Sequence, residues 1–333
     1  MALKWGIASA GKISHDFVNA MGTLSEGIHH VVAVAARDLD RAEDFAKRFD
    51  IPKAYGSYKE LAQDPDVEVV YVGTLNPQHL EVGLLMLEHG KHVLVEKPLC
   101  LNEKQAQQLI TYAEQKKLFL MEAIWSRFFP SYQYVRNQIK NGMLGDITMV
   151  EADIGSEGLD KVARIAKKDL GGGTVVDLGV YLIQFCQWVY EQAPKSINAR
   201  GTLNEEGVDL EMFAEMTYGD NKMAKIKSSG LTKLSRNARI VGTKGQITLL
   251  NFNGSTTIID VDGTQKTWSL PQAQHYFNLS GSCGLRYEAE EVRKCIREGK
   301  MESNLVTHNE SLLIARIEDE IRKQIGVKYP EDD

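Results

Sequence analysis

The stretch Leu3–Ser14, which reads LKWGIASAGKIS, decides how the first part of the chain folds. Its first half is a short apolar run, Leu3–Ser9, which predicts a buried strand, and helical spacing follows over Lys12–Met21. Aligned on Gly11, the turn between them is a degenerate G-x-G-x-x-G with serines in the outer glycine positions. Its place between a first strand and a first helix is that of a dinucleotide-binding fingerprint.

This turn has the chemistry to hold a pyrophosphate. A glycine lets the backbone approach a phosphate closely, and the start of a helix offers unpaired N–H groups and the positive end of the helix dipole. The sequence therefore predicts coenzyme contacts from Ser9, Gly11, Lys12 and Ile13. A tight turn of small residues is also a common structural solution, so its position carries more weight than its composition.

Strand-like and helical segments alternate as far as Glu122. The run Val31–Ala36 (VVAVAA) is apolar throughout, as is typical of a parallel strand that is buried on both faces. Further strands are expected at Val67–Gly73, His92–Val95 and Leu118–Glu122, separated by helices such as Gln78–His89 and Asn102–Gln115. This alternation predicts an α/β Rossmann-type domain with a parallel sheet that binds a dinucleotide, over residues 1–122.

The pattern changes after Phe129-Pro130. A helix is expected over Ser131–Asn141, a strand over Asp146–Ile154 and a long helix over Thr174–Tyr190. Residues Ser196–Leu270 have the sequence pattern of successive strands separated by closely spaced turns. This pattern predicts a large, mostly antiparallel, open-faced sheet. Two helices close the chain. Residues 123–333 are therefore predicted to form a second domain of the α+β class.

Composition excludes several classes of protein. The 333 residues carry a formal net charge of −6, which argues against the basic surface that a general nucleic-acid binder needs. No apolar run approaches the roughly 20 residues that cross a bilayer, and the start of the chain lacks a secretory pattern. The four cysteines form no C-x-x-C pair, and the eight histidines have no ligand spacing. We therefore expect a cytoplasmic protein with free thiols, no metal, no nucleic-acid partner and no membrane contact.

The end of the second strand indicates which dinucleotide binds. NAD-binding domains usually place an acidic residue here for the ribose 2′-hydroxyl, whereas this chain has Arg37, with Arg41 four residues later. Arginine offers a bidentate fork to a phosphate. Asp38 is better explained as the cap of the next helix, and NADP is predicted. Alternatively, both arginines are solvated charges at the start of a helix.

Two polar segments follow later strands, at the sheet edge where open α/β folds bind ligands. One segment contains Thr74, Asn76 and His79, and the other is Glu96-Lys97-Pro98. Lys97 closes an apolar strand, so we expect it to be partly buried and able to hold a substrate oxygen or transfer a proton. The alternatives are that Lys97 pairs with a neighbouring charge and that His79 only begins a helix.

A glycine-rich segment, Gly171–Tyr181, precedes the long helix of the second domain. Asp177 and Tyr181 lie four residues apart, so an α-helix places them on one face. A lysine ammonium can stabilise a tyrosine phenolate, and Asp177 would then hold Lys97 in place. The alternative is a buried tyrosine hydrogen-bonded to a helix carboxylate.

Together these segments resemble the glucose–fructose oxidoreductase / inositol dehydrogenase family over essentially the whole chain. The resemblance rests on Gly6–Ser14, Asn76–His79, Gly90–Pro98, Met121–Ala123 with Arg127–Pro130, and Asp177–Tyr181. Within the family, four segments are similar in sequence to members that act on a trans-dihydrodiol or on D-xylose. These segments are Trp5–Ile7, Val31–Asp38, Ile51–Tyr58 and Met121–Trp125.

The resemblance implies oxidation of trans-1,2-dihydrobenzene-1,2-diol to catechol and of D-xylose to D-xylono-1,5-lactone, with NADP accepting the hydride. It implies Lys97, Asp177 and Tyr181 in the catalytic positions, with Tyr71 and His79 lining the coenzyme site beside Thr74, Asn76 and Glu96. It also implies a homodimer formed through the open face of the C-terminal sheet. Many family members have histidine in place of Tyr181, so either Tyr181 or Lys97 could accept the proton.

Two other functions remain open on the same scaffold. One is a non-catalytic regulator that senses NADP, although such a protein has no need of Lys97, Asp177 and Tyr181. The other is a reductase of a different carbonyl substrate, because a shared fold does not fix the substrate.

Overall fold

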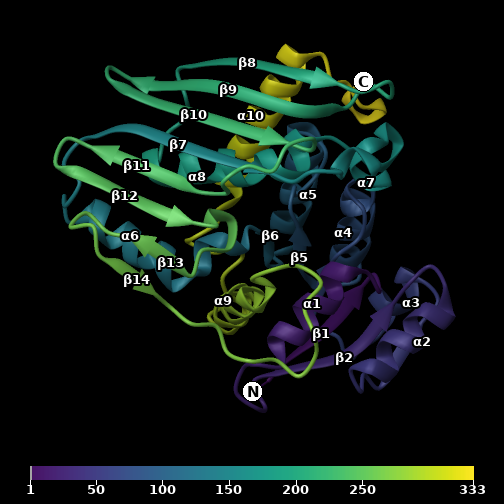
Figure 1. The fold of residues 1–333 in the computed structure, drawn as a ribbon. Coiled ribbons are helices and arrows are strands. Elements are labelled where there is room, and N and C mark those ends of the chain that lie inside the picture. The colour runs from purple at the N-terminus through teal and green to yellow at the C-terminus, as the bar shows by residue number, and fades with distance from the viewer. Residues whose placement is uncertain (1) are drawn as a thin grey trace. The chain divides into compact units, whose positions relative to one another are not determined.

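The computed structural model describes residues 2–333, which divide into two compact units (Figure 1). The first unit comprises the chain up to Cys100 together with Lys104–Trp125 and Leu270–His308. The second comprises Leu101–Glu103, Ser126–Ser269 and Asn309–Asp333. Compared with the predicted division into 1–122 and 123–333, the first unit also takes in a segment that follows the large sheet.

A six-stranded parallel sheet forms the centre of the first unit. Its spatial order is β3-β2-β1-β4-β5-β6, the order of a dinucleotide-binding Rossmann sheet. The strands are β1 (Leu3–Ala8), β2 (His29–Ala35), β3 (Lys53–Tyr55), β4 (Val69–Val72), β5 (His92–Glu96) and β6 (Leu120–Ala123). Every neighbouring pair is parallel, which confirms the predicted fold of this part of the chain.

Among residues 2–333, six α-helices belong to this unit, and two of them begin at a side-chain cap. The six helices are α1 (Lys12–Met21), α2 (Leu39–Arg48), α3 (Tyr58–Gln63), α4 (His79–Glu88), α5 (Glu103–Lys116) and α9 (Leu285–Arg297). The side chain of Asp38 accepts a hydrogen bond from the backbone N–H of Asp40 at the start of α2, as predicted. Ser57 caps α3 in the same way through the N–H of Glu60. These caps satisfy backbone donors that have no partner inside the helix.

Asp16 on α1 explains why residues 270–308 belong to the first unit. Its side chain is fully buried, yet its two carboxylate oxygens accept hydrogen bonds from the backbone N–H groups of Asn278 and Leu279, at 2.8 and 2.9 Å. The side-chain amide of Asn278 also donates to Asp16 at 2.9 Å. A buried carboxylate is tolerated where hydrogen bonds replace its lost hydration. Asp16 therefore fastens a segment about 260 residues away to the first helix.

An eight-stranded sheet dominates the second unit, in the order β14-β13-β12-β11-β7-β10-β9-β8. The strands are β7 (Ile147–Gly155), β8 (Ser196–Leu203), β9 (Asp209–Gly219), β10 (Lys222–Ser229), β11 (Ala238–Gly242), β12 (Gly245–Leu250), β13 (Thr257–Ile259) and β14 (Gln265–Thr267). The pair β7 and β10 is parallel and the other neighbouring pairs are antiparallel. The predicted mostly antiparallel sheet is confirmed.

The two faces of this sheet differ. On β9, buried Met212, Ala214 and Met216 alternate with the partly exposed residues between them, as a strand with one covered face requires. The covering helices are α6 (Pro130–Lys140), α8 (Val180–Tyr190) and α10 (His308–Ile325), which lie on one side of the sheet (Figure 1). The opposite face carries the ion pairs Glu151–Arg239 and Lys225–Glu215.

The helix predicted over Thr174–Tyr190 differs from expectation at its start. A π-helical turn, Val175–Gly179, comes first, and α-helical geometry begins only at Val180. Asp177 therefore lies in the π-helical turn and Tyr181 in the α-helix. Single π-helical turns of this kind often occur at functional sites.

Two expectations from composition concern the whole chain. The four cysteines are buried and free of disulfides. Among residues 2–333, no helix is long and apolar enough to cross a membrane.

Replacing Asp16 with asparagine should lower the free energy of unfolding by about 2 kcal/mol, since the amide brings a donor to a site where three donors already converge. Urea unfolding measures this change. The matched control is Asp44→Asn, which changes an exposed carboxylate on α2 and should leave stability within about 0.5 kcal/mol of wild type. Equal stability of the two variants would show that Asp16 does not hold the 270–308 segment.

Candidate coenzyme and catalytic site

The turn between β1 and α1 leaves the start of the helix open to a ligand. Gly11 is the N-cap residue of α1, and no side chain of the described residues caps that end of the helix. Ser9 has a φ of 105°, a backbone conformation that favours glycine. A Cβ atom on Gly11 would lie 3.2 Å from Ser9 Oγ. The predicted residues Ser9, Gly11, Lys12 and Ile13 thus form one turn whose uncapped N–H groups can bind an anion.

Gly73 at the end of β4 is a residue that sequence reasoning missed. A Cβ atom on it would lie 2.6 Å from Ser14 Oγ and 2.9 Å from Tyr71 Cε1, closer than any side chain can approach. Only glycine therefore allows the end of β4 to approach α1 this closely. Its signal in the sequence is a lone glycine directly after an apolar strand.

The end of β2 presents the two predicted arginines. Arg37 and Arg41 are both exposed. Their positive charges also act on Tyr58 at the start of α3, where burial raises the pKa of the phenol and the two arginines lower it. The structure thus brings Arg37, Arg41 and Tyr58 together, and Tyr58 was not among the predicted site residues.

Tyr71 and Glu96 form a buried pair at the ends of β4 and β5. The Tyr71 hydroxyl donates to Glu96 Oε1 at 2.5 Å, and the Tyr71 ring stacks on Phe17 with the ring centres 3.9 Å apart. The other oxygen of Glu96 accepts from the backbone N–H of Lys97 at 3.2 Å. Glu96 is therefore tied to the residue that follows it, and the Lys97–Pro98 peptide bond is cis.

His79 joins the two loops that follow β4 and β5. Its ring is fully buried, with Nδ1 2.8 Å from the carbonyl oxygen of Pro98 and Nε2 3.2 Å from that of Thr74. Burial lowers the pKa of His79 and favours the neutral ring, which can donate to only one of the two carbonyls. His79 can thus fix the loops that carry Thr74 and Lys97.

Glu288 on α9 is a second residue that sequence reasoning missed. It is fully buried, and neither carboxylate oxygen has a hydrogen-bond partner among residues 2–333. Burial raises the pKa of Glu288 well above its usual range, and the nearby charge of Glu96 raises it further. Nothing in the sequence pattern of α9 marks this residue as different from a solvated helix glutamate.

The glycine-rich segment of the second unit is held by Asp209, which was also not predicted. The Asp209 carboxylate accepts hydrogen bonds from Thr174 Oγ1 at 2.6 Å and from the backbone N–H of Val175 at 2.8 Å. Gly173 has a φ of 123°, and a Cβ atom there would lie 2.5 Å from Asp209 Oδ1. Burial raises the pKa of Asp209. Asp209 therefore anchors the start of the segment that carries Asp177 and Tyr181.

Arg164 is the partner that the structure gives to Asp177. It lies on α7 (Ala163–Ala166), and its Nη1 donates to Asp177 Oδ1 at 2.5 Å. Both Asp177 and Tyr181 raise the pKa of Arg164 through their charges. Lys97 belongs to the first unit, and its predicted pairing with Asp177 and Tyr181 stays a prediction.

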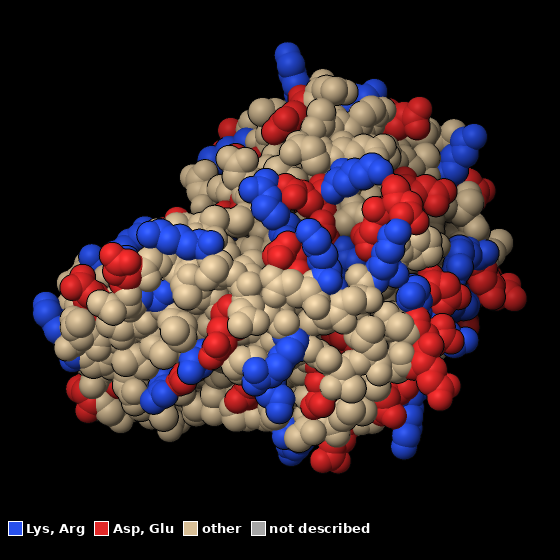
Figure 2. All heavy atoms as spheres, turned by 90° about the horizontal axis from the view of Figure 1, so that it is seen from above, with Lys and Arg blue, Asp and Glu red and all other residues tan. Residues whose placement is uncertain are grey.

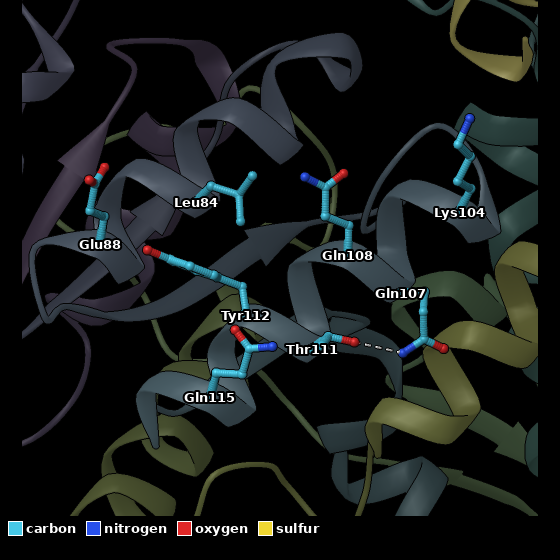
Figure 3. Close-up of a pocket in the computed structure, with 8 residues that line it drawn as sticks. All are labelled: Leu84, Glu88, Lys104, Gln107, Gln108, Thr111, Tyr112 and Gln115. Atoms are coloured by element: carbon cyan, nitrogen blue, oxygen red, sulfur yellow. Dashed lines mark hydrogen bonds between the residues drawn. The ribbon is translucent and has the colours of Figure 1, made fainter.

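A surface pocket lies between α4 and α5 (Figure 3). It contains none of the predicted site residues, and its lining is mostly uncharged. The lining residues are Leu84, Glu88, Lys104, Gln107, Gln108, Thr111, Tyr112 and Gln115. Among the described residues, no group of three or more histidine, cysteine or acidic side chains could hold a metal ion.

Replacing Ser9 with glycine should raise the free energy of unfolding by about 1 kcal/mol, because a φ of 105° strains a residue that has a Cβ atom. Thermal or urea unfolding measures the gain. The control is Ser9→Ala, which removes the hydroxyl but keeps the Cβ atom and should show no such gain. A stabilised alanine variant would mean that the hydroxyl, rather than the backbone conformation, is the unfavourable feature.

Comparisons with known proteins agree with this architecture. Residues 3–124 match the oxidoreductase family with an NAD-binding Rossmann fold, and residues 132–248 match the GFO/IDH/MocA C-terminal domain. Trans-1,2-dihydrobenzene-1,2-diol dehydrogenase of Xenopus tropicalis is 45% identical over 331 residues, which cover 99% of this chain and 100% of that protein. The human protein of the same name is 43% identical over 333 residues, covering 100% and 99% of the two chains.

Solved structures support the fold. A 3-ketoreductase from Actinomadura kijaniata, bound to NADP and TDP-benzene, superposes with a TM-score of 0.83 at 22% identity over 99% of both chains. A levoglucosan dehydrogenase bound to NADH and levoglucosan gives 0.82 at 17% identity over 97% of both chains. With two matching domains and relatives above 40% identity along its whole length, the chain belongs to the GFO/IDH/MocA family of oxidoreductases.

Proposed function

We propose that this protein is an NADP-dependent dehydrogenase that oxidises trans-1,2-dihydrobenzene-1,2-diol to catechol. The observation that carries the proposal is the similarity of the whole chain, at 43–45% identity, to relatives named for that reaction. We extend the proposal to D-xylose and its oxidation to D-xylono-1,5-lactone, since both substrates present a hydroxyl on a ring carbon that carries a hydrogen.

The residues at the edge of the parallel sheet fit an NADP molecule. The uncapped N–H groups at the start of α1 suit a pyrophosphate, together with Ser9, Gly11, Lys12 and Ile13. Arg37 and Arg41 suit the 2′-phosphate. Thr74 Oγ1 is buried without a partner among the described residues and is available to a polar ligand. The nicotinamide end is assigned to Tyr71, Thr74, Asn76, His79, Glu96 and Lys97.

We assign Tyr181 as the group that accepts the proton of the substrate hydroxyl. NADP, when bound, supplies the acceptor for the hydride that leaves the same carbon. Lys97 stabilises the tyrosine as phenolate, and Asp177 orients Lys97. In the competing assignment, Lys97 takes the proton and Tyr181 only binds the substrate.

We also propose a homodimer formed through the face of the eight-stranded sheet that carries the Glu151–Arg239 and Lys225–Glu215 pairs. Acidic and basic side chains are interspersed over the surface seen in Figure 2, with uncharged surface between them. Because the sheet face itself carries acidic and basic side chains in these two pairs, it can pair with a second copy of itself, as an isologous interface requires. A cytoplasmic location stays a prediction from the sequence.

The first test follows NADPH absorbance after the protein is mixed with NADP and trans-1,2-dihydrobenzene-1,2-diol or D-xylose. Wild type should turn over, and Lys97→Met should lose at least about a hundredfold in kcat while its NADPH binding stays largely intact. Lys47→Met, on the exposed side of α2, is the matched control. Tight NADPH binding without turnover in wild type would favour an NADP sensor or a reductase of another carbonyl substrate.

The second test concerns the choice of coenzyme. Arg37→Gln should raise the Kd for NADP by about ten- to a hundredfold and leave the Kd for NAD unchanged, because it removes a charged hydrogen bond worth about 1.5–3 kcal/mol. Arg48→Gln, at the far end of α2, should change neither value. Equal losses for both coenzymes would contradict a contact between Arg37 and the 2′-phosphate.

A further inference from the structure

Arg164 is a charged residue beside the assigned catalytic tyrosine that the proposed reaction does not yet use. Its guanidinium donates to Asp177 at 2.5 Å, across thirteen residues of sequence. The Asp177 side chain is 15% exposed and that of Arg164 is 49% exposed, so this pair lies at the border between protein and solvent. An isolated pair at such a border adds little stability.

The backbone around Arg164 is built to hold it in this place. The N–H of Gly173 donates to the carbonyl of Ile165 at 2.9 Å, and the N–H of Gly172 donates to that of Lys167 at 3.0 Å. A Cβ atom on Gly172 would lie 2.4 Å from the oxygen of Ile165. The glycines therefore let the backbone that directly follows Arg164 dock onto the segment that carries Asp177.

A third contact fixes the end of α7. The side-chain amide of Asn204 donates to the carbonyl oxygen of Ala166 at 2.8 Å. Ile165, which neighbours Arg164, is fully buried. Arg164 thus extends from a helical turn whose backbone is fixed on two sides, although its side chain reaches solvent. A salt bridge formed only by flexible surface side chains has no comparable support.

Two neighbouring elements contribute electrostatic interactions with Tyr181. Arg164 interacts with Tyr181 from α7, and Tyr132 interacts with it from α6. Burial raises the pKa of Tyr132, which keeps that side chain neutral. Strands β7 and β10 pack against α8, and their buried side chains are not titratable. These are Val150, Ala152, Ile154, Ala224, Ile226 and Ser228.

We propose that Arg164 is a positioning residue that holds Asp177 by its ion pair and stabilises the phenolate form of Tyr181. The proposal rests on the role assigned to Tyr181 above. A guanidinium is positively charged at any working pH and carries five N–H donors. One nitrogen holds Asp177, and the positive charge remains close enough to act on the tyrosine oxygen.

Removing Arg164 changes the charge near Tyr181 in two ways. The positive charge that favours the phenolate is lost, and the negative charge of Asp177 loses its ion pair with Arg164. Both changes favour the protonated phenol. Removing Asp177 instead leaves Arg164 unbalanced and favours the phenolate. The two single variants should therefore shift the titration of Tyr181 in opposite directions, which a merely structural role would not do.

The test is a titration of Tyr181 by tyrosinate absorbance in the ultraviolet. Each protein is compared with the same protein carrying Tyr181→Phe, so that the difference reports Tyr181 alone. Arg164→Gln should move this titration up by about one pH unit, Arg164→Lys should move it less, and Asp177→Asn should move it down. Arg316→Gln, which breaks the exposed Glu103–Arg316 ion pair on α10, should leave it unchanged.

A Tyr181 titration that is the same in Arg164→Gln and in wild type would overturn the proposal. The readout does not depend on turnover, so a wild type inactive on every diol and sugar would contradict the proposed function and leave this test intact. Where wild type is active, the acid limb of its kcat/KM profile should move up in Arg164→Gln, while the Kd for NADPH stays the same. Arg164→Lys, which keeps the charge, provides the result if the glutamine variant fails to fold.

Discussion

The complete burial of the central parallel strands is the constraint on which the rest of the molecule depends. All of β4 and all but the first residue of β5 are buried, and each strand is bonded on both sides by a parallel neighbour. Such a sheet has no room for unpaired polar side chains along its length. Polar chemistry can enter only where the strands end, and Arg37, Thr74 and Lys97 follow three of those ends. The same burial forces a glycine at position 73, where strand end and helix approach too closely for any side chain.

Three buried carboxyl groups, Asp16, Asp209 and Glu288, differ in how many hydrogen-bond donors they have. Asp16 accepts hydrogen bonds from backbone and side-chain donors of the 270–308 segment, so it holds this segment on α1. Asp209 has donors on one oxygen only, and burial raises its pKa. Glu288 has donors on neither oxygen, and its pKa is raised further by Glu96. As donors become fewer, the neutral acid becomes the favoured form, because hydrogen bonds are what compensates a carboxylate for lost water.

Sequence patterns predicted the fold well because the deciding signals are local. Apolar runs located the parallel strands, and Asp38 caps the helix that was predicted to follow the second strand. The residues missed at the site are those whose role depends on distant partners. Asp209 bonds to a segment that lies 34 residues earlier in the sequence. Glu288 interacts with Glu96, which is far away in the sequence. Tyr58 interacts with Arg37, and a strand separates the two in the sequence. The π-helical turn at Val175–Gly179 was missed because its helix looks continuous in sequence, whereas the turn depends on packing against neighbouring elements.

Arg164 escaped detection for the same reason, and its place changes how the electrostatics of the site are understood. From sequence alone, Lys97 was the cation available to a tyrosinate at position 181. Lys97 belongs to the first unit, so its effect on Tyr181 depends on how the two units are placed. Arg164 belongs to the same unit as Asp177 and Tyr181, and the backbone contacts of Gly172 and Gly173 fix it there. A cation on the same unit acts on the tyrosine in every arrangement of the two units. The proposed stabilisation of the Tyr181 phenolate therefore has a contribution from within the second unit, in addition to the one assigned to Lys97.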